Sequence, residues 1–134
     1  MSKLKKIVAA IMAATTVATL SVGALAVDYE HYTFEFKLGS YKSAFSTSAK
    51  KQDDLNYAKA NCKEGNLDSS FYVWLSVYND ANDAPNVRVS YYKKATSLEN
   101  YQLDYSKVMR KDDKCYLKAE TDTYGAQVKG KWDP

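Results

Sequence analysis

The chain has 134 residues with 19 Lys+Arg against 16 Asp+Glu, and 46% of its residues are hydrophobic. This length fits a single domain that buries a core without metal ions or several disulfides. Three basic residues lie in segment 1–26, so segment 27–134 has 16 basic and 16 acidic residues and no net charge. A neutral domain without a Lys/Arg stripe excludes the electrostatic footprint of a nucleic-acid binder. It also predicts no long-range attraction to anionic lipids or wall polymers.

The N-terminus has the three parts of a secretory signal peptide. It begins with a basic region formed by Lys3, Lys5 and Lys6. An apolar, Ala-rich helical stretch covers residues 7–20, and Ala24 and Ala26 place small residues before a cleavage point between Ala26 and Val27. The sequence therefore predicts a signal peptide over 1–26 and a secreted domain over 27–134.

A permanent membrane anchor is the alternative for the same segment. Four hydroxyl side chains dilute its apolar run, namely Thr15, Thr16, Thr19 and Ser21. The charged stop-transfer flank that follows a typical spanning helix is also missing. We therefore expect cleavage, secretion and no stable membrane insertion of the mature chain.

Aromatic residues are unusually frequent in segment 27–134, which holds all 12 Tyr, 4 Phe and 2 Trp. Such residues favour the pleated, half-buried surface of a strand. The first strand is predicted over 32–38, where apolar and polar residues alternate with a period of two up to Gly39. A second extended stretch is predicted over 41–49, ahead of a polar turn at 50–54.

Segment 55–62 alternates again and brings Ala58, Ala60 and Cys62 to one side. A short helix is the alternative, because Ala and Lys are good helix formers. We prefer a strand because the run is brief and ends at Glu64-Gly65-Asn66.

Further strands are predicted over 71–78, 87–92, 101–105, 115–120 and 126–132. Turns or exposed connections separate them, over 79–86, 93–100, 111–114 and 121–125. Seven or so short strands without a convincing helix predict an all-β domain, either a single antiparallel β-sandwich or a small barrel.

The strand at 71–78 is apolar on both faces, which is typical of a central strand. One face is uniformly apolar and is expected to pack on the core, with Phe71, Val73, Leu75 and Val77. The opposite face carries Tyr72, Trp74, Ser76 and Tyr78. Because Tyr and Trp tolerate partial exposure and are common at interfaces, we hypothesise that Tyr72, Trp74 and Tyr78 form an exposed strip that binds a glycan or protein. The alternative is that a second layer covers them, which makes Trp74 a core residue.

Cys62 and Cys115 are the two cysteines of the chain. An even count in an exported chain allows one disulfide, which would lower the entropy of the unfolded chain and stabilise the fold by roughly 4 kcal/mol. The alternative is two separate buried thiols that behave as small hydrophobic residues. The bridge is slightly favoured.

Catalytic and metal-binding patterns are weak in this sequence. His31 is the only histidine and adjoins the new N-terminus, so it is a poor catalytic base, and one His with two Cys gives zinc too few ligands. The loop with Asp80, Asn82 and Asp83 offers oxygens for calcium but lacks the Gly and Glu of an EF-hand loop, and Asx-turn chemistry explains the same residues. We expect no metal and no cofactor.

Glycoside hydrolysis requires a pair of carboxylates, and the 16 acidic residues of the chain offer such pairs. The acids cluster in turns, at Asp53-Asp54 and Asp112-Asp113, where solvated acids normally lie. We therefore expect a protein without enzymatic activity.

Three short segments carry a resemblance to known proteins: the Tyr32/Phe34/Phe36 strand, the Tyr116–Ala119 stretch and the closing Val128–Pro134. With the export signal, they resemble small secreted proteins of Gram-positive bacteria that are grouped as a domain of unknown function. The plan is also similar to lactococcin-type bacteriocins, which are small exported β-sandwiches, although their His- and Gly-rich composition is absent. Neither resemblance implies catalytic residues.

The sequence as a whole predicts a secreted, non-enzymatic β-sandwich that binds a glycan or protein at or beyond the bacterial surface. The alternatives are a bacteriocin-like antagonist and a small cell-wall hydrolase or inhibitor. The sequence does not fix the oligomeric state.

Overall fold

The computed structural model describes residues 32–39 and 42–134. The predicted signal peptide, its cleavage point at Ala26/Val27, and His31 all lie outside the described residues. The described chain is all-β, with ten strands in two antiparallel sheets and no helix. The all-β sandwich prediction is confirmed. In the same residues, no helix has the length and apolarity needed to span a bilayer.

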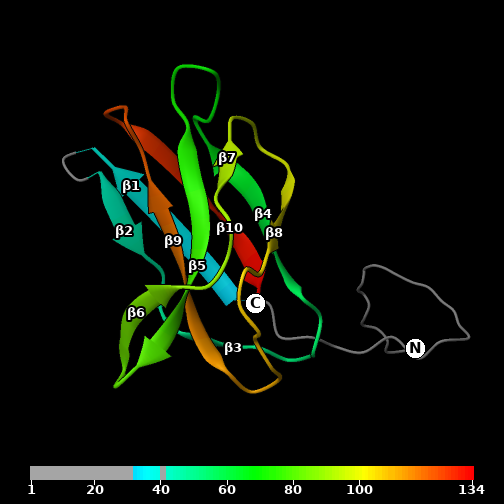
Figure 1. Ribbon diagram of the computed structural model, residues 1–134. Coiled ribbons are helices and arrows are strands. Elements are labelled where there is room, and N and C mark those ends of the chain that lie inside the picture. The colour runs from blue at the N-terminus through cyan, green and yellow to red at the C-terminus, as the bar shows by residue number, and fades with distance from the viewer. Residues whose placement is uncertain (1–31, 40–41) are drawn as a thin grey trace, which may run out of the picture.

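Sheet A has the strand order β1-β10-β4-β8. Its strands are β1 (Tyr32–Leu38), β10 (Ala126–Asp133), β4 (Tyr57–Gly65) and β8 (Asn100–Asp104). The earliest and latest described strands are direct partners, in a register that runs from Tyr32 opposite Trp132 to Leu38 opposite Ala126. Figure 1 shows β10 in red between β1 and β4.

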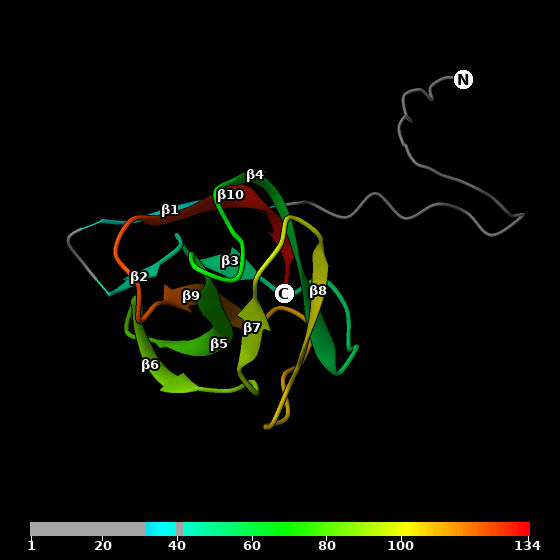
Figure 2. The same cartoon turned by 90° about the horizontal axis from the view of Figure 1, so that it is seen from above.

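Sheet B has the strand order β2-β9-β5-β6. These strands are β2 (Ser43–Phe45), β9 (Lys114–Glu120), β5 (Val73–Ala81) and β6 (Ala84–Arg88). Two short strands extend the sheet, β3 (Ala49–Lys50) beside β9 and β7 (Lys93–Ala95) beside β5. Seen from above, the two sheets form two layers, and β8 bends from the first layer toward β7 (Figure 2).

Period-two alternation builds the core between these layers. Along β5, Val73, Leu75 and Val77 point inward and are fully buried. The facing sheet contributes the largest buried side chains, Trp132 and Phe36, each 1% exposed. The other inward positions of the long strands are also buried, including Phe34, Leu38, Ala58, Ala60, Cys62, Leu103, Cys115, Leu117, Ala119 and Val128.

Several strand boundaries differ from the sequence prediction. The stretch predicted over 41–49 is divided between β2 and β3, and the exposed connection predicted over 93–100 contains β7. Most of the turn predicted over 79–86 is strand, because Asn82 and Asp83 with φ of 57° and 64° close a two-residue hairpin between β5 and β6. Segment 55–62 is strand β4 rather than a helix, as preferred.

Phe71 was wrongly predicted to face the core with Val73. It lies before β5, is 37% exposed, and belongs to a turn around Asp68. The Asp68 carboxylate accepts hydrogen bonds from the backbone N–H groups of Ser70 and Phe71 at 2.6 and 2.8 Å. This turn ends the period-two pattern that a strand beginning at 71 requires.

Candidate functional site

The outer face of sheet B carries the predicted aromatic strip. The structure places Tyr72, Trp74 and Tyr78 on this face, each half-buried, with no further layer of the described chain over them (Figure 2). Ser76 differs from the prediction because it is fully buried. It is small, lies between Trp74 and Tyr78 and pairs with Lys118, so its larger neighbours shield it.

Neighbouring strands extend the strip into a broader surface, which we call the aromatic face. Besides the predicted strip it includes Phe45 of β2, Tyr116 and Lys118 of β9, Arg88 of β6, Lys94 of β7, and Tyr92. The strand register explains the gathering. Tyr78 pairs with Tyr116 on one side and with Arg88 on the other, and Phe45 pairs with Lys118.

Lys118 lies at the centre of one ring cluster. Its Nζ is 5.0 Å from the ring centroid of Tyr78 and 5.4 Å from that of Phe45. These two rings meet edge to face with centroids 5.2 Å apart. Glu120 Oε2 is 3.8 Å from the same Nζ, and the Lys118 side chain keeps only 16% exposure. Lys118 therefore covers apolar ring surface with its stem while its charge contacts ring faces and a carboxylate.

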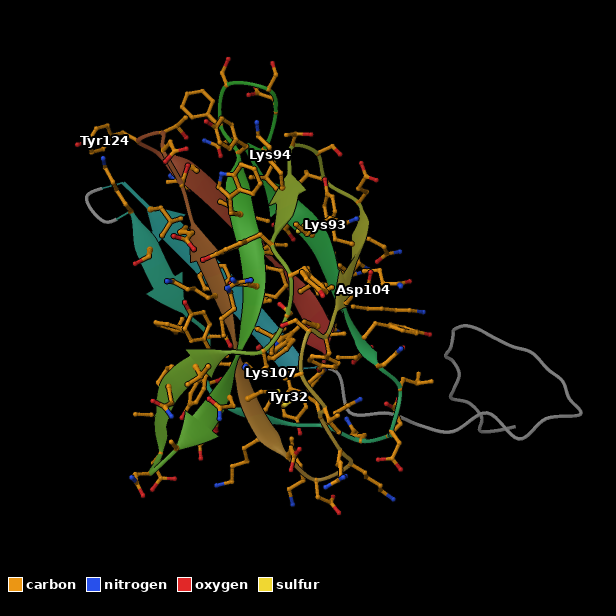
Figure 3. All side chains as sticks on the ribbon, viewed as in Figure 1. Tyr32, Lys93, Lys94, Asp104, Lys107 and Tyr124 are labelled. Atoms are coloured by element: carbon orange, nitrogen blue, oxygen red, sulfur yellow. The ribbon has the colours of Figure 1, made fainter. Side chains whose placement is uncertain are left out.

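Lys94 forms a second, similar cluster further along β5. It pairs with Trp74, and its Nζ lies 4.1 Å from the Tyr72 ring centroid and 5.5 Å from the Trp74 ring (Figure 3). Across the strand, Trp74 pairs with Glu120. The indole of Trp74 is thus bordered by an ammonium group on one side and a carboxylate on the other.

The tyrosines at the other end of the aromatic face are held as neutral groups. The Tyr116 hydroxyl donates to Asp80 Oδ1 at 2.9 Å, and desolvation and this hydrogen bond raise the pKa of Tyr116 above its usual value. Desolvation and the nearby Glu120 raise the pKa of Tyr92, although the Arg88 guanidinium, 4.1 Å from the ring centroid, lowers it. These phenols therefore keep their protons at neutral pH and can donate hydrogen bonds.

Much of this surface was missed by the sequence reasoning. A strand was predicted over 115–120, and a period of two along it places Tyr116, Lys118 and Glu120 opposite the core-facing Cys115, Leu117 and Ala119. That pattern could have added Tyr116 and Lys118 to the predicted strip. The position of Phe45 carried no such signal, because β2 is only three residues long.

The two cysteines are free and buried in the structure, so the favoured Cys62–Cys115 bridge is not formed there. Cys115 lies at the start of β9, where it pairs with Ala49. Cys62 lies on the other sheet, in the second half of β4. Burial raises the pKa of each thiol to about 12, with Glu99 adding to the shift at Cys62.

The candidate calcium loop and the paired acids have structural roles. Asp80 accepts the Tyr116 hydrogen bond, and Asp83 lies 3.8 Å from Lys114. Asp54 accepts from the backbone of Lys111 at 2.8 Å, and Asp113 accepts from that of Arg110 at the same distance. Within the described ranges, no three His, Cys, Asp or Glu side chains gather as metal ligands.

Comparisons of the chain with protein-family models, with curated proteins and with solved structures found no match. The resemblances drawn from short sequence segments therefore stay hypotheses, and the aromatic face is the basis for a functional proposal.

Proposed function

We propose that this protein is a secreted, non-enzymatic binding domain whose aromatic face contacts a glycan or protein at or beyond the surface of a Gram-positive bacterium. One observation carries the proposal: Trp74, Tyr72 and Tyr78 are partly exposed on the outer face of sheet B, beside the exposed rings of Phe45 and Tyr92, and no further layer of the described chain covers that face. Monomeric proteins rarely leave a contiguous patch of large aromatic side chains open to solvent unless it serves recognition.

The arrangement of the side chains supports binding. Strands of one sheet hold the rings, so little side-chain or loop entropy is lost when a partner docks. Lys94, Lys118 and Glu120 add polar groups beside the rings. Aromatic anchors with a polar surround are typical of recognition surfaces.

The test uses Trp74→Ala in the mature chain. Fluorescently labelled protein is incubated with Gram-positive cells, and bound protein is measured over a concentration series. We expect the variant to lose at least about tenfold in affinity, since truncating an aromatic anchor commonly costs 2 kcal/mol or more of binding free energy. Pretreatment of the cells with protease or with periodate distinguishes a protein partner from a glycan.

Tyr124→Ala is the matched control. Tyr124 is 68% exposed and lies in the β9–β10 turn, at the end of the molecule (Figure 3). Its replacement should leave binding unchanged. Wild-type protein that does not bind the cells, or equal binding by Trp74→Ala at unchanged thermal stability, contradicts the proposal.

A further inference from the structure

The outer face of sheet A, on the opposite side of the sandwich from the aromatic face, has a hollow of about 560 Å³ over β10, β4 and β8. Its lining is polar and includes Lys59, Asn61, Lys63, Asn100, Gln102 and Lys131. A second hollow of about 480 Å³ continues over β1 and shares two of these residues, Lys63 and Lys131. The two lysines thus lie where both hollows meet.

Lys63 and Lys131 differ from the other lysines of this face because neither side chain has an ion-pair, hydrogen-bond or ring partner among the described residues. Lys37 and Lys129 lie 3.3 and 3.4 Å from Glu35 and Glu64, the two carboxylates that line the second hollow. Lys59 pairs in register with Asp133, the carboxylate of the first hollow, and lies 5.8 Å from the Tyr57 ring. The carboxylates around the two hollows thus lie beside other lysines.

The strand register places the two unpaired lysines near each other, and a bulge leaves one of them without a residue opposite it. Lys131 pairs with Asn61, and the register shifts between Lys129 and Gly130, which leaves Lys63 as the extra residue of a bulge. Gly130 is required there, because a Cβ would lie 1.8 Å from the carbonyl oxygen of Asn61. Lys63 and Lys131 are therefore diagonal neighbours on one face and line both hollows, where like charges repel and lower stability unless an anion lies between them.

The donor set around these lysines indicates which anion fits. Ammonium groups and the side-chain amides of Asn61, Asn100 and Gln102 donate to oxygen atoms. No arginine lines either hollow, so the planar fork that recognises carboxylates bidentately is missing. Lysines acting as point charges suit the tetrahedral oxygens of phosphate. Two hollows that meet at Lys63 and Lys131 offer space on either side of these lysines, which suits a ligand with more than one anionic group.

We infer that the outer face of sheet A binds a phosphodiester-type polymer, with a phosphate group held between Lys63 and Lys131 and its neighbours lying along the two hollows. Lys63 and Lys131 are not part of the aromatic face, although the far end of the second hollow reaches Phe45, which belongs to both surfaces. The site also refines the expectation from net charge: an overall neutral domain attracts a polyanion when its unpaired cations are concentrated in one place.

The test measures binding of linear polyphosphate to the mature chain by calorimetry at several salt concentrations. The double variant K63Q/K131Q should bind at least tenfold more weakly at low salt, and the slope of log K against log salt should fall by roughly one to two. The control K37Q/K114Q removes the same charge but takes away lysines that line neither hollow and already lie 3.3 and 3.8 Å from Glu35 and Asp83, and its affinity should stay within about threefold of wild type.

Two further ligands identify the anion. Polygalacturonate carries carboxylates along a polymer and should bind more weakly than polyphosphate. If inorganic phosphate also binds and K63Q/K131Q weakens its binding by the same factor as that of polyphosphate, the site is supported and its ligand is a free phosphate group. The inference is overturned if polyphosphate does not bind, if both double variants lose affinity equally, or if polygalacturonate binds as tightly.

Discussion

Lys51 is the most unusual residue of the core, because its side chain has no exposed surface. Its Nζ donates to Asp53 Oδ1 at 2.9 Å and lies 5.2 Å from the Tyr105 ring centroid. The sequence predicted a solvated turn over 50–54, and nothing in the composition of that turn distinguishes a lysine that points inward. The burial follows from tertiary pairing, since the Lys51 backbone N–H donates to the carbonyl of Asp113 at 2.9 Å.

Replacing the carboxylate and replacing the ammonium group of this ion pair should change the free energy of unfolding in different ways. Asp53→Ala leaves a buried ammonium group without its carboxylate and should lower the free energy of unfolding by about 2–4 kcal/mol, less than for a fully buried pair because Asp53 keeps 25% exposure. Lys51→Met keeps the volume and removes the charge, so its stability should equal or exceed that of wild type. Urea unfolding measures both, and equal losses in the two variants would contradict this account.

The two thiols make stability sensitive to alkaline pH. Burial raises the pKa of Cys62 and of Cys115 to about 12, whereas a thiol in the unfolded chain ionises near 8.5. Between these values the unfolded state loses protons that the folded state retains, so the free energy of unfolding falls as pH rises from about 8.5 toward 12. Urea unfolding at pH 8 and pH 10.5 should show this fall, and it should be smaller in the double variant C62A/C115A.

Thiol titration checks the same residues directly. At pH 8 the folded protein should react slowly with a thiol reagent, because the thiols are buried and protonated. Two thiols per chain should react after denaturation without reductant. If denatured protein from culture medium has no reactive thiol in the absence of reductant, the disulfide predicted from the sequence has formed.

At the scale of single strands, the bulge between β10 and β4 depends on one glycine. Gly130→Ala places a methyl group against the backbone of β4, and neither strand can yield without breaking the central pairing of sheet A. We expect a loss of roughly 3 kcal/mol or more in the free energy of unfolding, at the upper end of ordinary substitutions. Gly39→Ala is the matched control, since nothing lies within 4 Å of its added carbon. Comparable thermal stability of the two variants would mean that the bulge is adaptable.

The strands that could be predicted from sequence are those whose side chains alternate over several residues. The predicted strands match β1, β9 and β10 to within one residue at either end. The prediction did not divide the extended stretch over 41–49 into β2 and β3, and it missed β7; these three strands are two or three residues long. Such strands are stabilised by pairing with longer neighbours rather than by a local pattern, so no short window of sequence contains the information.

The candidate site was predictable to a similar extent. The strip on β5 could be read from one strand, because a single apolar run has two distinguishable faces. The residues around the strip could not be predicted in this way, because strand order and register place Lys94, Lys118 and Phe45 beside it. The unpaired lysines of sheet A depend in the same way on a register shift.

At the scale of the whole molecule, the export signal makes a prediction about the mature chain. If Ala24-Leu25-Ala26 directs cleavage, N-terminal sequencing of the protein from culture medium should begin at Val27. The cell fraction provides the comparison, because a retained precursor keeps Met1. Intact Met1 recovered in the membrane fraction would show that the segment is an anchor.

The distribution of charge over the surface is a second property of the whole molecule, and the sequence gives only the net charge. Segment 27–134 is neutral, yet the unpaired Lys63 and Lys131 and the strip of Tyr72, Trp74 and Tyr78 lie on opposite outer faces of the sandwich. The net charge does not predict this separation. The separation depends on which residues of each strand point outward and on which strands become neighbours.

The pairing of β1 with β10 also constrains when the molecule can fold. If the chain is exported as proposed and crosses the membrane unfolded with its N-terminus first, β1 emerges early, while β10, its only strand partner among the described residues, is the last described strand to arrive. Until β10 arrives, β1 is an unpaired edge. Strand β4 also lacks its neighbour β10, whose Trp132 pairs with Ala60 of β4. Because contacts so distant along the chain form slowly, the domain should complete sheet A only after translocation. An extracytoplasmic chaperone or a lag before protease resistance would then belong to its normal biogenesis.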